Sequence, residues 1–232
     1  MLDELKERVF KANLEIVKKG LVIHTWGNVS GRDPDTGFIV IKPSGICYDS
    51  MKPEDMVVLD NEGKTVEGKY KPSTDAPTHL LLYNTFSLIG AVVHTHSTYA
   101  TSWAQAGKAI PPFGTTHADH YFGEVPCSRK LTDNEVNTSY EVNTGKVIVE
   151  TLKGLDPLSV PSVLVNSHGP FCWGADTDEA VHNAVALEEI ARMAFYTVLL
   201  GHRKPIDGYL LDKHYRRKHG KDSYYGQNKP EN

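Results

Sequence analysis

The clearest chemical signal in the sequence is a pair of histidines, His94 and His96, at the end of the apolar run from Leu88 to His94. Side chains two residues apart on a strand point to the same face. Both imidazoles can therefore aim at one point, which is the convergence that a divalent cation needs. Packed or surface histidines often show the same spacing, so the pair alone is a weak indication of metal.

A third histidine, His168, follows a second apolar run at residues 163–166. Gly169 and Pro170 predict a turn directly after it. Ligand-binding crevices of α/β proteins form at the ends of strands, so two strands that both end in histidine strengthen the metal hypothesis. For His168 by itself, an ordinary turn histidine remains the alternative.

Asp75 offers an oxygen ligand to the same metal. It falls in the first turn of a predicted helix that Ser73 or Thr74 caps, where the helix dipole also favours a carboxylate. On the sequence alone, the capping role is the favoured interpretation. Three histidines and a carboxylate would suit Zn²⁺, with Mn²⁺ or another first-row divalent metal as the alternative.

Three segments have the composition of an anion cradle. They are residues 25–30 (TWGNVS), 42–45 (KPSG) and 71–74 (KPST), each with small hydroxyl or amide residues beside glycine or lysine. Backbone N–H groups in such turns bind phosphate well, although each segment alone also fits an ordinary turn. None matches a Walker or dinucleotide fingerprint, which disfavours nucleotide binding.

The elements that must position these residues alternate between helix and strand. An amphipathic N-terminal helix ends at Gly20, a helix over 98–105 ends at Gly107, and the longest helix, 178–200, ends at Gly201. Strands are expected at 38–42, 56–59, 64–67, 88–94 and 163–166, with one or two helices in 133–151 and a basic, aromatic segment at 210–220. Helices interleaved with strands predict one α/β layered domain.

Composition narrows the class of protein. The 232 residues carry 25 lysines and arginines against 29 acidic residues, a formal net charge of −4, which predicts binding neither to nucleic acid nor to an anionic membrane. Three cysteines without a CxxC pair are interpreted as free thiols in a reducing compartment, and we expect a cytoplasmic protein. Eleven histidines are a large number for a core of this size and fit a metal or acid–base enzyme.

Eight segments, in this order, resemble those of the L-ribulose-5-phosphate 4-epimerases, a family within the class II aldolase and adducin-head superfamily. They are TWGNVS, IKPSG, KPSTDAPTH, VVHTHS, GTTHAD, SHGPFCWG, LLDKHYRRKHG and YYGQ. The resemblance runs from the first helix to Gln227. It implies a single three-layer α/β/α domain over residues 1–232, a sugar-phosphate substrate, and a cyclic homotetramer with active sites at the subunit interfaces.

The resemblance also implies roles for particular residues. The implied zinc ligands are Asp75, His94, His96 and His168, and the implied phosphate-binding residues are Gly27, Asn28, Ser44, Gly45, Ser73 and Thr74. The implied acid–base pair is Asp119 from one subunit and Tyr225 from its neighbour, with residues 220–232 contributing to the neighbouring subunit's site. Further substrate contacts are expected from Thr116, His117, His214 and Arg217, although a solvated helix face is the alternative for the last two.

The implied reaction inverts carbon 4 of a ketopentose 5-phosphate by breaking and remaking the bond between carbons 3 and 4. Three alternatives stay open at this point. A sugar-phosphate aldolase would release the two fragments, but those enzymes usually have glutamate at the position of Asp75. An adducin-type head would share the fold without a metal, and a metal hydrolase would need a motif that the sequence does not display. The pathway that the enzyme serves is also left open.

Overall fold

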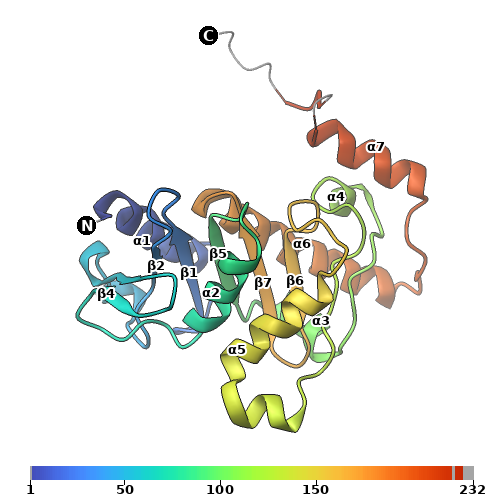
Figure 1. Ribbon diagram of the computed structural model, residues 1–232. Helices are drawn as coiled ribbons and strands as arrows, with labels where there is room; N and C mark the ends of the chain where they lie inside the picture. The colour runs from blue at the N-terminus through green and yellow to red at the C-terminus, as the bar shows by residue number, and fades with distance from the viewer. Residues whose placement is uncertain (1, 221–222, 227–232) are drawn as a thin grey trace.

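The computed structural model describes residues 2–220 and 223–226, and its centre is one antiparallel sheet (Figure 1). The seven strands run in the order β4-β3-β2-β1-β5-β7-β6. Their bounds are β1 Gly27–Arg32, β2 Ile39–Ile41, β3 Val57–Leu59, β4 Thr65–Glu67, β5 Ala91–Thr95, β6 Ser162–Val165 and β7 Gly169–Gly174. The strand that carries the His-x-His pair, β5, is therefore a central strand between β1 and β7.

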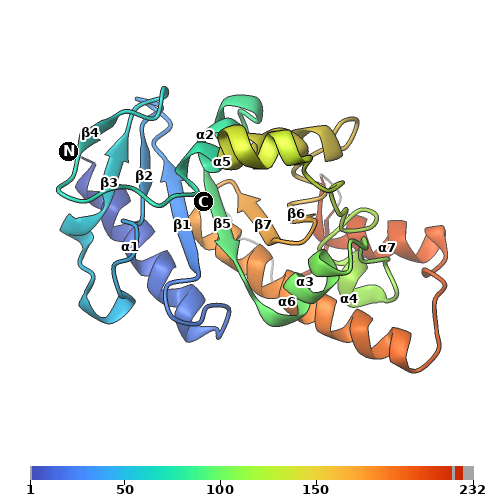
Figure 2. The same ribbon diagram turned by 90° about the horizontal axis from the view of Figure 1, so that it is seen from below.

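Helices cover both faces of the sheet, as Figure 2 shows. On one face α1 and α3 pack against α6, and on the other face α2 packs against α5. The helices are α1 Asp3–Lys18, α2 Ala76–Thr85, α3 Thr98–Gln105, α4 Thr115–Ala118, α5 Asp133–Thr151, α6 Thr177–Leu199 and α7 Gly208–Lys218, with short 3-10 turns at Tyr48–Ser50 and Pro53–Asp55. The expected three-layer α/β/α fold is confirmed.

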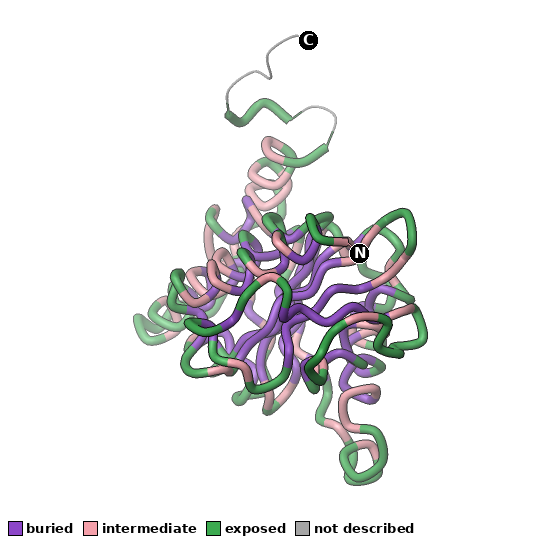
Figure 3. The backbone as a smooth tube through the Cα atoms, turned by 90° about the vertical axis from the view of Figure 1, so that its left-hand side faces the viewer, coloured by how far each residue is buried: buried purple, intermediate pink, exposed green. Residues whose placement is uncertain are grey.

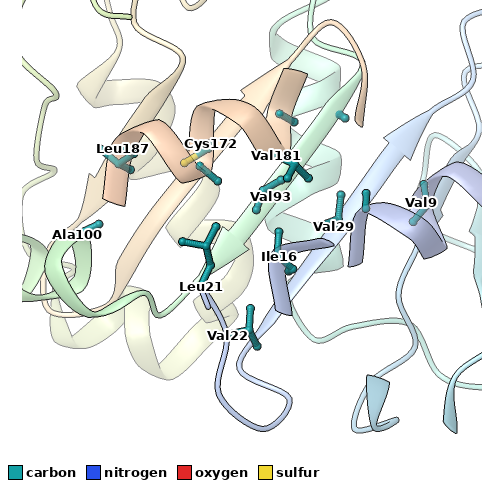
Figure 4. Close-up of a cluster of buried hydrophobic side chains, with 14 of the residues drawn as sticks. Val9, Ile16, Leu21, Val22, Val29, Val93, Ala100, Cys172, Val181 and Leu187 are labelled. Carbon is teal, nitrogen blue, oxygen red and sulfur yellow. The ribbon is translucent and has the colours of Figure 1, made fainter. Parts of the chain in front are cut away.

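Alternation along β5 decides which face carries the chemistry. Val93 belongs to the apolar cluster between the sheet and α1 and α6, which Figure 4 shows in close-up. Val92 belongs to the cluster on the side of α2 and α5. Because successive strand side chains point to opposite faces, His94 shares the face of Val92 and lies under α2 and α5. It stacks there on Phe171 of β7, with ring centroids 4.2 Å apart.

The glycine stop signals of the sequence are confirmed. Gly20, Gly107 and Gly201 follow the ends of α1, α3 and α6 with φ angles of 72°, 63° and 88°. This left-handed conformation suits glycine because it has no Cβ. These helices accordingly end within two residues of the expected positions.

Two strands were not anticipated, and one expected turn is wrong. Gly169 and Pro170 do not turn the chain but begin β7, which pairs with β5 and β6. The turn comes earlier, at Ser167, whose φ is 63°. Residues 27–30 of the expected turn segment 25–30 instead belong to β1, which lies between β2 and β5. In both places, pairing with β5, which is distant in the sequence, outweighs the local turn preference of the segment.

The chain ends in an arm that extends from the three layers. Helix α7 has no buried residue and extends away from the sheet in Figures 1 and 3. The implied tail contribution of residues 220–232 falls largely outside the described residues, which include only 220 and 223–226 of that stretch. Among the described helices, none combines the length and apolar character that crossing a membrane would require.

Candidate metal centre and active site

Three imidazoles meet where β5 and β6 end. His94 lies in β5, His96 follows that strand directly, and His168 is the last residue of the turn between β6 and β7. The Nε2 atoms of His94 and His96 are 3.1 Å apart, and one ligand atom from each of the three histidines falls within a group no wider than 4.8 Å. This convergence fits a divalent cation, because a tetrahedral ion brings its nitrogen ligands to about this separation.

The histidines are held in the orientation that a metal ligand needs. The Nδ1–H of His94 donates to the carbonyl oxygen of Pro170 at 2.9 Å, which leaves its Nε2 unprotonated and directed into the cluster. Burial lowers the pKa of all three imidazoles, and His94 and His96 further lower that of His168, to about 3. All three are therefore neutral at pH 7, the form that binds metal.

Asp75 lies at the edge of this cluster, at the N-cap position of α2. The expected cap by Ser73 or Thr74 is therefore wrong, and the side chain of Asp75 accepts no capping hydrogen bond, although its place at the helix N-terminus is one that the dipole favours. Instead its Oδ2 accepts from Nδ2 of Asn28 at 2.7 Å. Burial would raise the pKa of Asp75, but the imidazoles of His94 and His79 and the hydrogen bond from Asn28 outweigh it and lower the pKa. The carboxylate is thus ionised beside the histidines, although it stands outside the tight group of three.

The histidines open into a polar cleft of about 420 Å³. The cleft joins the three segments that the sequence marked as anion cradles. Its walls include all of the expected phosphate-binding and metal-ligating positions, Gly27, Asn28, Ser44, Gly45, Ser73, Thr74, Asp75, His94, His96 and His168. Their roles stay predictions, but the structure brings together in one place residues that are far apart in the sequence.

Six residues of the cleft were not singled out as site residues from the sequence: Thr25, Trp26, Lys42, Pro43, Tyr140 and Glu141. Lys42 is 2% exposed, and its Nζ donates to the carbonyl oxygen of Ile46 at 2.9 Å. Burial lowers the pKa of this lysine. Lys42 stood within a quoted cradle segment, whereas Tyr140 and Glu141 lie in a region where the sequence set no helix boundary.

Asp119 does not line this cleft. It follows α4, and its carboxylate binds α7 of the same chain, accepting from Arg217 Nη2 at 2.6 Å and His214 Nδ1 at 3.0 Å. Lys218 Nζ is 3.4 Å from the same carboxylate. Burial raises the pKa of Asp119, but the hydrogen bonds from Arg217 and His214 lower it by more, so the group is ionised. The predicted site residues His214 and Arg217 are therefore partners of Asp119.

Tyr225 lies beside Asp119, in a second cavity of about 320 Å³ that both residues line. The ring of Tyr225 faces Lys218 Nζ at 4.5 Å and the Arg217 guanidinium at 5.0 Å. No residue that lines this cavity also lines the histidine cleft. Within the described part of one chain, the two residues of the predicted acid–base pair thus lie close to each other, but in a different cavity from the predicted metal ligands.

Thr116 and His117 line neither of these cavities. They face a smaller cavity of about 140 Å³ beside α6. His117 is 4% exposed, its Nε2–H donates to the carbonyl oxygen of Gly123 at 2.7 Å, and burial lowers its pKa to about 4. In the isolated chain this histidine fixes the loop after α4, and substrate contact remains a prediction.

The fold and the cleft define the class of protein. Residues 7–195 match the family described as the class II aldolase and adducin N-terminal domain, and the chain belongs to this family. The solved structures that it resembles include an L-fuculose 1-phosphate aldolase, 26% identical with a TM-score of 0.78 over 91% of this chain and 94% of that one. Another, from Glaciozyma antarctica, is 20% identical with a TM-score of 0.76 over 93% and 81%, and shows the fold alone.

More similar sequences are found among curated epimerases. The chain is 56% identical to the L-ribulose-5-phosphate 4-epimerase UlaF of Salmonella paratyphi B, over 97% of this chain and 100% of the relative. The protein of the same name from Salmonella typhi is also 56% identical over the same shares. The resemblance noted from the sequence motifs is confirmed at the level of the whole chain.

Proposed function

We propose that this chain is an L-ribulose-5-phosphate 4-epimerase, an isomerase that interconverts L-ribulose 5-phosphate and D-xylulose 5-phosphate. The observation that carries the proposal is 56% identity to curated epimerases over nearly the whole chain. The histidine cluster and the polar cleft beside it supply the groups that such a reaction needs. The free cysteines suit a cytoplasmic enzyme.

The chemistry follows from the substrate. Carbon 4 of a ketopentose 5-phosphate has no acidic C–H, but its hydroxyl is β to the ketone. Loss of the hydroxyl proton with cleavage of the bond between carbons 3 and 4 gives a three-carbon enediolate and glycolaldehyde phosphate. Rotation of the aldehyde presents its other face, and re-formation of the bond with return of the proton gives the inverted centre.

We propose that His94, His96 and His168, with Asp75 as the fourth ligand, hold a divalent cation. Three neutral imidazoles and a carboxylate are a typical donor set for Zn²⁺, and Mn²⁺ is the alternative. When bound, the cation acts as a Lewis acid for the negative charge that develops on the ketone and enediol oxygens. Asn28 orients Asp75 through its hydrogen bond to Oδ2.

The cradle around the cleft would hold the phosphate of the substrate and so retain the aldehyde fragment. Gly45 has a φ of 68° and no atom within 4 Å of an added Cβ, which leaves its backbone open to a ligand. Ser44 and Thr74 are exposed and Ser73 is buried, so hydroxyl groups line both the rim and the floor. The motifs of Ser44, Gly45, Ser73 and Thr74 support this assignment.

The acid–base groups would reach the cleft from a neighbouring subunit. Asp119 and Tyr225 line one cavity of the same chain and not the cleft, so we propose that the neighbour supplies both, which differs from the initial division between two subunits. Arg217 holds Asp119 and faces Tyr225, and could fix the two groups relative to each other. A closed homotetramer would complete one site per subunit, because each chain gives a cleft to one neighbour and an arm to the other.

A coupled assay tests the activity. Purified protein with L-ribulose 5-phosphate should produce D-xylulose 5-phosphate at a rate that depends on bound metal. Net release of glycolaldehyde phosphate without the epimer would instead indicate a sugar-phosphate aldolase, the alternative that the structural match to an L-fuculose 1-phosphate aldolase keeps in view. A preparation without metal that does not respond to added Zn²⁺ would indicate an adducin-type module.

A further inference from the structure

The histidine cleft is bordered by a break in α5. Ser139 has a φ of −142° and a ψ of 70°, so the helical conformation stops at this residue and resumes after it. The two residues that follow the break, Tyr140 and Glu141, line the cleft, whereas the four that precede it are not among the residues of its walls. The break therefore coincides with the only part of α5 that contacts the cleft in the described structure.

Buried side chains stabilise the break in α5. Asn143 is 8% exposed, and its Nδ2 donates across the break to the carbonyl oxygen of Glu135 at 2.9 Å and to Thr138 Oγ1 at 3.3 Å. Thr78 of α2 is 1% exposed, and its hydroxyl donates to the carbonyl oxygen of Glu141 at 2.6 Å. These bonds satisfy backbone acceptors near the interruption, so the break is a built feature rather than a frayed end.

The break brings a phenol to a histidine of the cluster. The hydroxyl of Tyr140 is 3.2 Å from Nδ1 of His168. His94 has a corresponding partner, the carbonyl oxygen of Pro170, at its own Nδ1. Histidine ligands of metals commonly use the second ring nitrogen in this way, which fixes both the tautomer and the direction of the ring.

We propose that Tyr140 is a positioning residue of the metal centre. It accepts the Nδ1–H of His168, so that Nε2 of the imidazole is unprotonated and faces the cation, and the broken α5 is the element that delivers it. The inference rests on the proposed role of His168 as a ligand. His168 needs such a partner more than His94 does, because it lies in a turn whereas His94 is fixed within a strand and stacked on Phe171.

The test is Tyr140→Phe in the full-length protein, which keeps the ring and removes the hydroxyl. Zn²⁺ affinity, measured by competition with a chelator, should fall about 10- to 100-fold, the usual loss when an outer partner of a histidine ligand is removed. Nitrogen-15 NMR of the metal-free protein should show a lower population of the Nδ1–H tautomer for His168. Asn143→Ala, which loosens the break but keeps Tyr140, should lower the affinity in the same direction.

The matched control is Tyr121→Phe. Tyr121 is a fully buried tyrosine whose hydroxyl pairs with Ser162 Oγ at 2.8 Å, and it lines neither the cleft nor the histidine cluster. This change should lower stability and leave Zn²⁺ affinity unaltered. Unchanged Zn²⁺ affinity and an unchanged His168 tautomer in Tyr140→Phe would overturn the proposal. His96→Asn separates this failure from that of the metal centre, because metal retained in His96→Asn would refute the ligand set itself.

Discussion

Mixing inactive variants tests whether the catalytic site is composite. His96→Asn should disable the cleft of its own chain, because an amide is a poorer metal ligand than an imidazole. Tyr225→Phe should remove the acid–base hydroxyl from the second cavity, where Tyr225 and Asp119 lie together. It should leave the ion pairs of Asp119 with α7 intact. Each variant alone should be inactive. A mixed oligomer, however, can pair an intact cleft with an intact arm.

The size of the recovery follows from the arrangement. In a closed oligomer assembled at random from equal amounts of both variants, the cleft subunit is intact with a probability of about one half and the arm subunit likewise, so about one quarter of the sites are complete. His96→Asn mixed with Tyr225→Phe, or with Asp119→Asn, should thus regain about one quarter of the wild-type activity. Asp119→Asn mixed with Tyr225→Phe should regain none, because one subunit supplies both residues and every subunit in this mixture lacks one of them.

The assay is epimerase activity after the variants are unfolded together and refolded, with subunit exchange verified by native mass spectrometry. Each variant refolded alone is the control. Recovery in the mixture of Asp119→Asn and Tyr225→Phe would show that the two residues serve a site from different subunits. Absence of recovery with His96→Asn, despite proven exchange, would show that cleft and arm act within one chain.

Three further outcomes are expected. His96→Asn should lose bound metal, measured by elemental analysis, whereas Tyr225→Phe should retain it. His117 has a pKa of about 4 in the folded chain against an ordinary 6.5, so its contribution to stability should be full above pH 6.5 and fall as the pH drops toward 4, by about 2 kcal/mol at pH 5. The free energy of unfolding in urea should therefore depend less on pH in His117→Gln than in the unmodified protein, and an equal dependence on pH would refute this. Gly27→Ala should cost about 1–3 kcal/mol, because its Cβ would meet Val22 Cγ2 at 2.8 Å and the His94 carbonyl oxygen at 3.0 Å, and an unaltered melting temperature would contradict it.

The sequence predicted elements best where the signal is local. The helix over 98–105 and the long helix that ends before Gly201 depend on periodicity and on a glycine stop, and both were located within a residue or two. The strand that begins at Gly169 pairs with the adjacent β6 and also with β5, which lies far away in the chain, and a local rule for glycine and proline therefore failed. The break at Ser139 also depends on tertiary contacts, since Thr78 of α2 helps to hold it.

The candidate site divides in the same way. The spacing of His94 and His96 indicated their convergence directly, because it is a property of one strand. The role of Asp75 could not be separated from helix capping until the structure placed Asn28 against its carboxylate. Tyr140 had no signal at all, since a tyrosine in an ill-defined helical region is ordinarily a surface residue. That the cavity of Asp119 and Tyr225 is separate from the cleft depends on the tertiary fold, which motifs do not report.

The register of three strands links the stability of the sheet to the geometry of the site. Asn28 pairs across the sheet with His94, and His94 pairs in turn with Phe171. These pairs bring the partner of Asp75, a candidate metal ligand and its stacking ring side by side. A slip of one residue between β1 and β5 would turn Asn28 to the opposite face and leave Asp75 without its donor. Gly27 lets β1 approach β5 closely at this position. Gly27→Ala should therefore weaken metal binding together with stability. The metal centre thus depends on a residue that has no side chain.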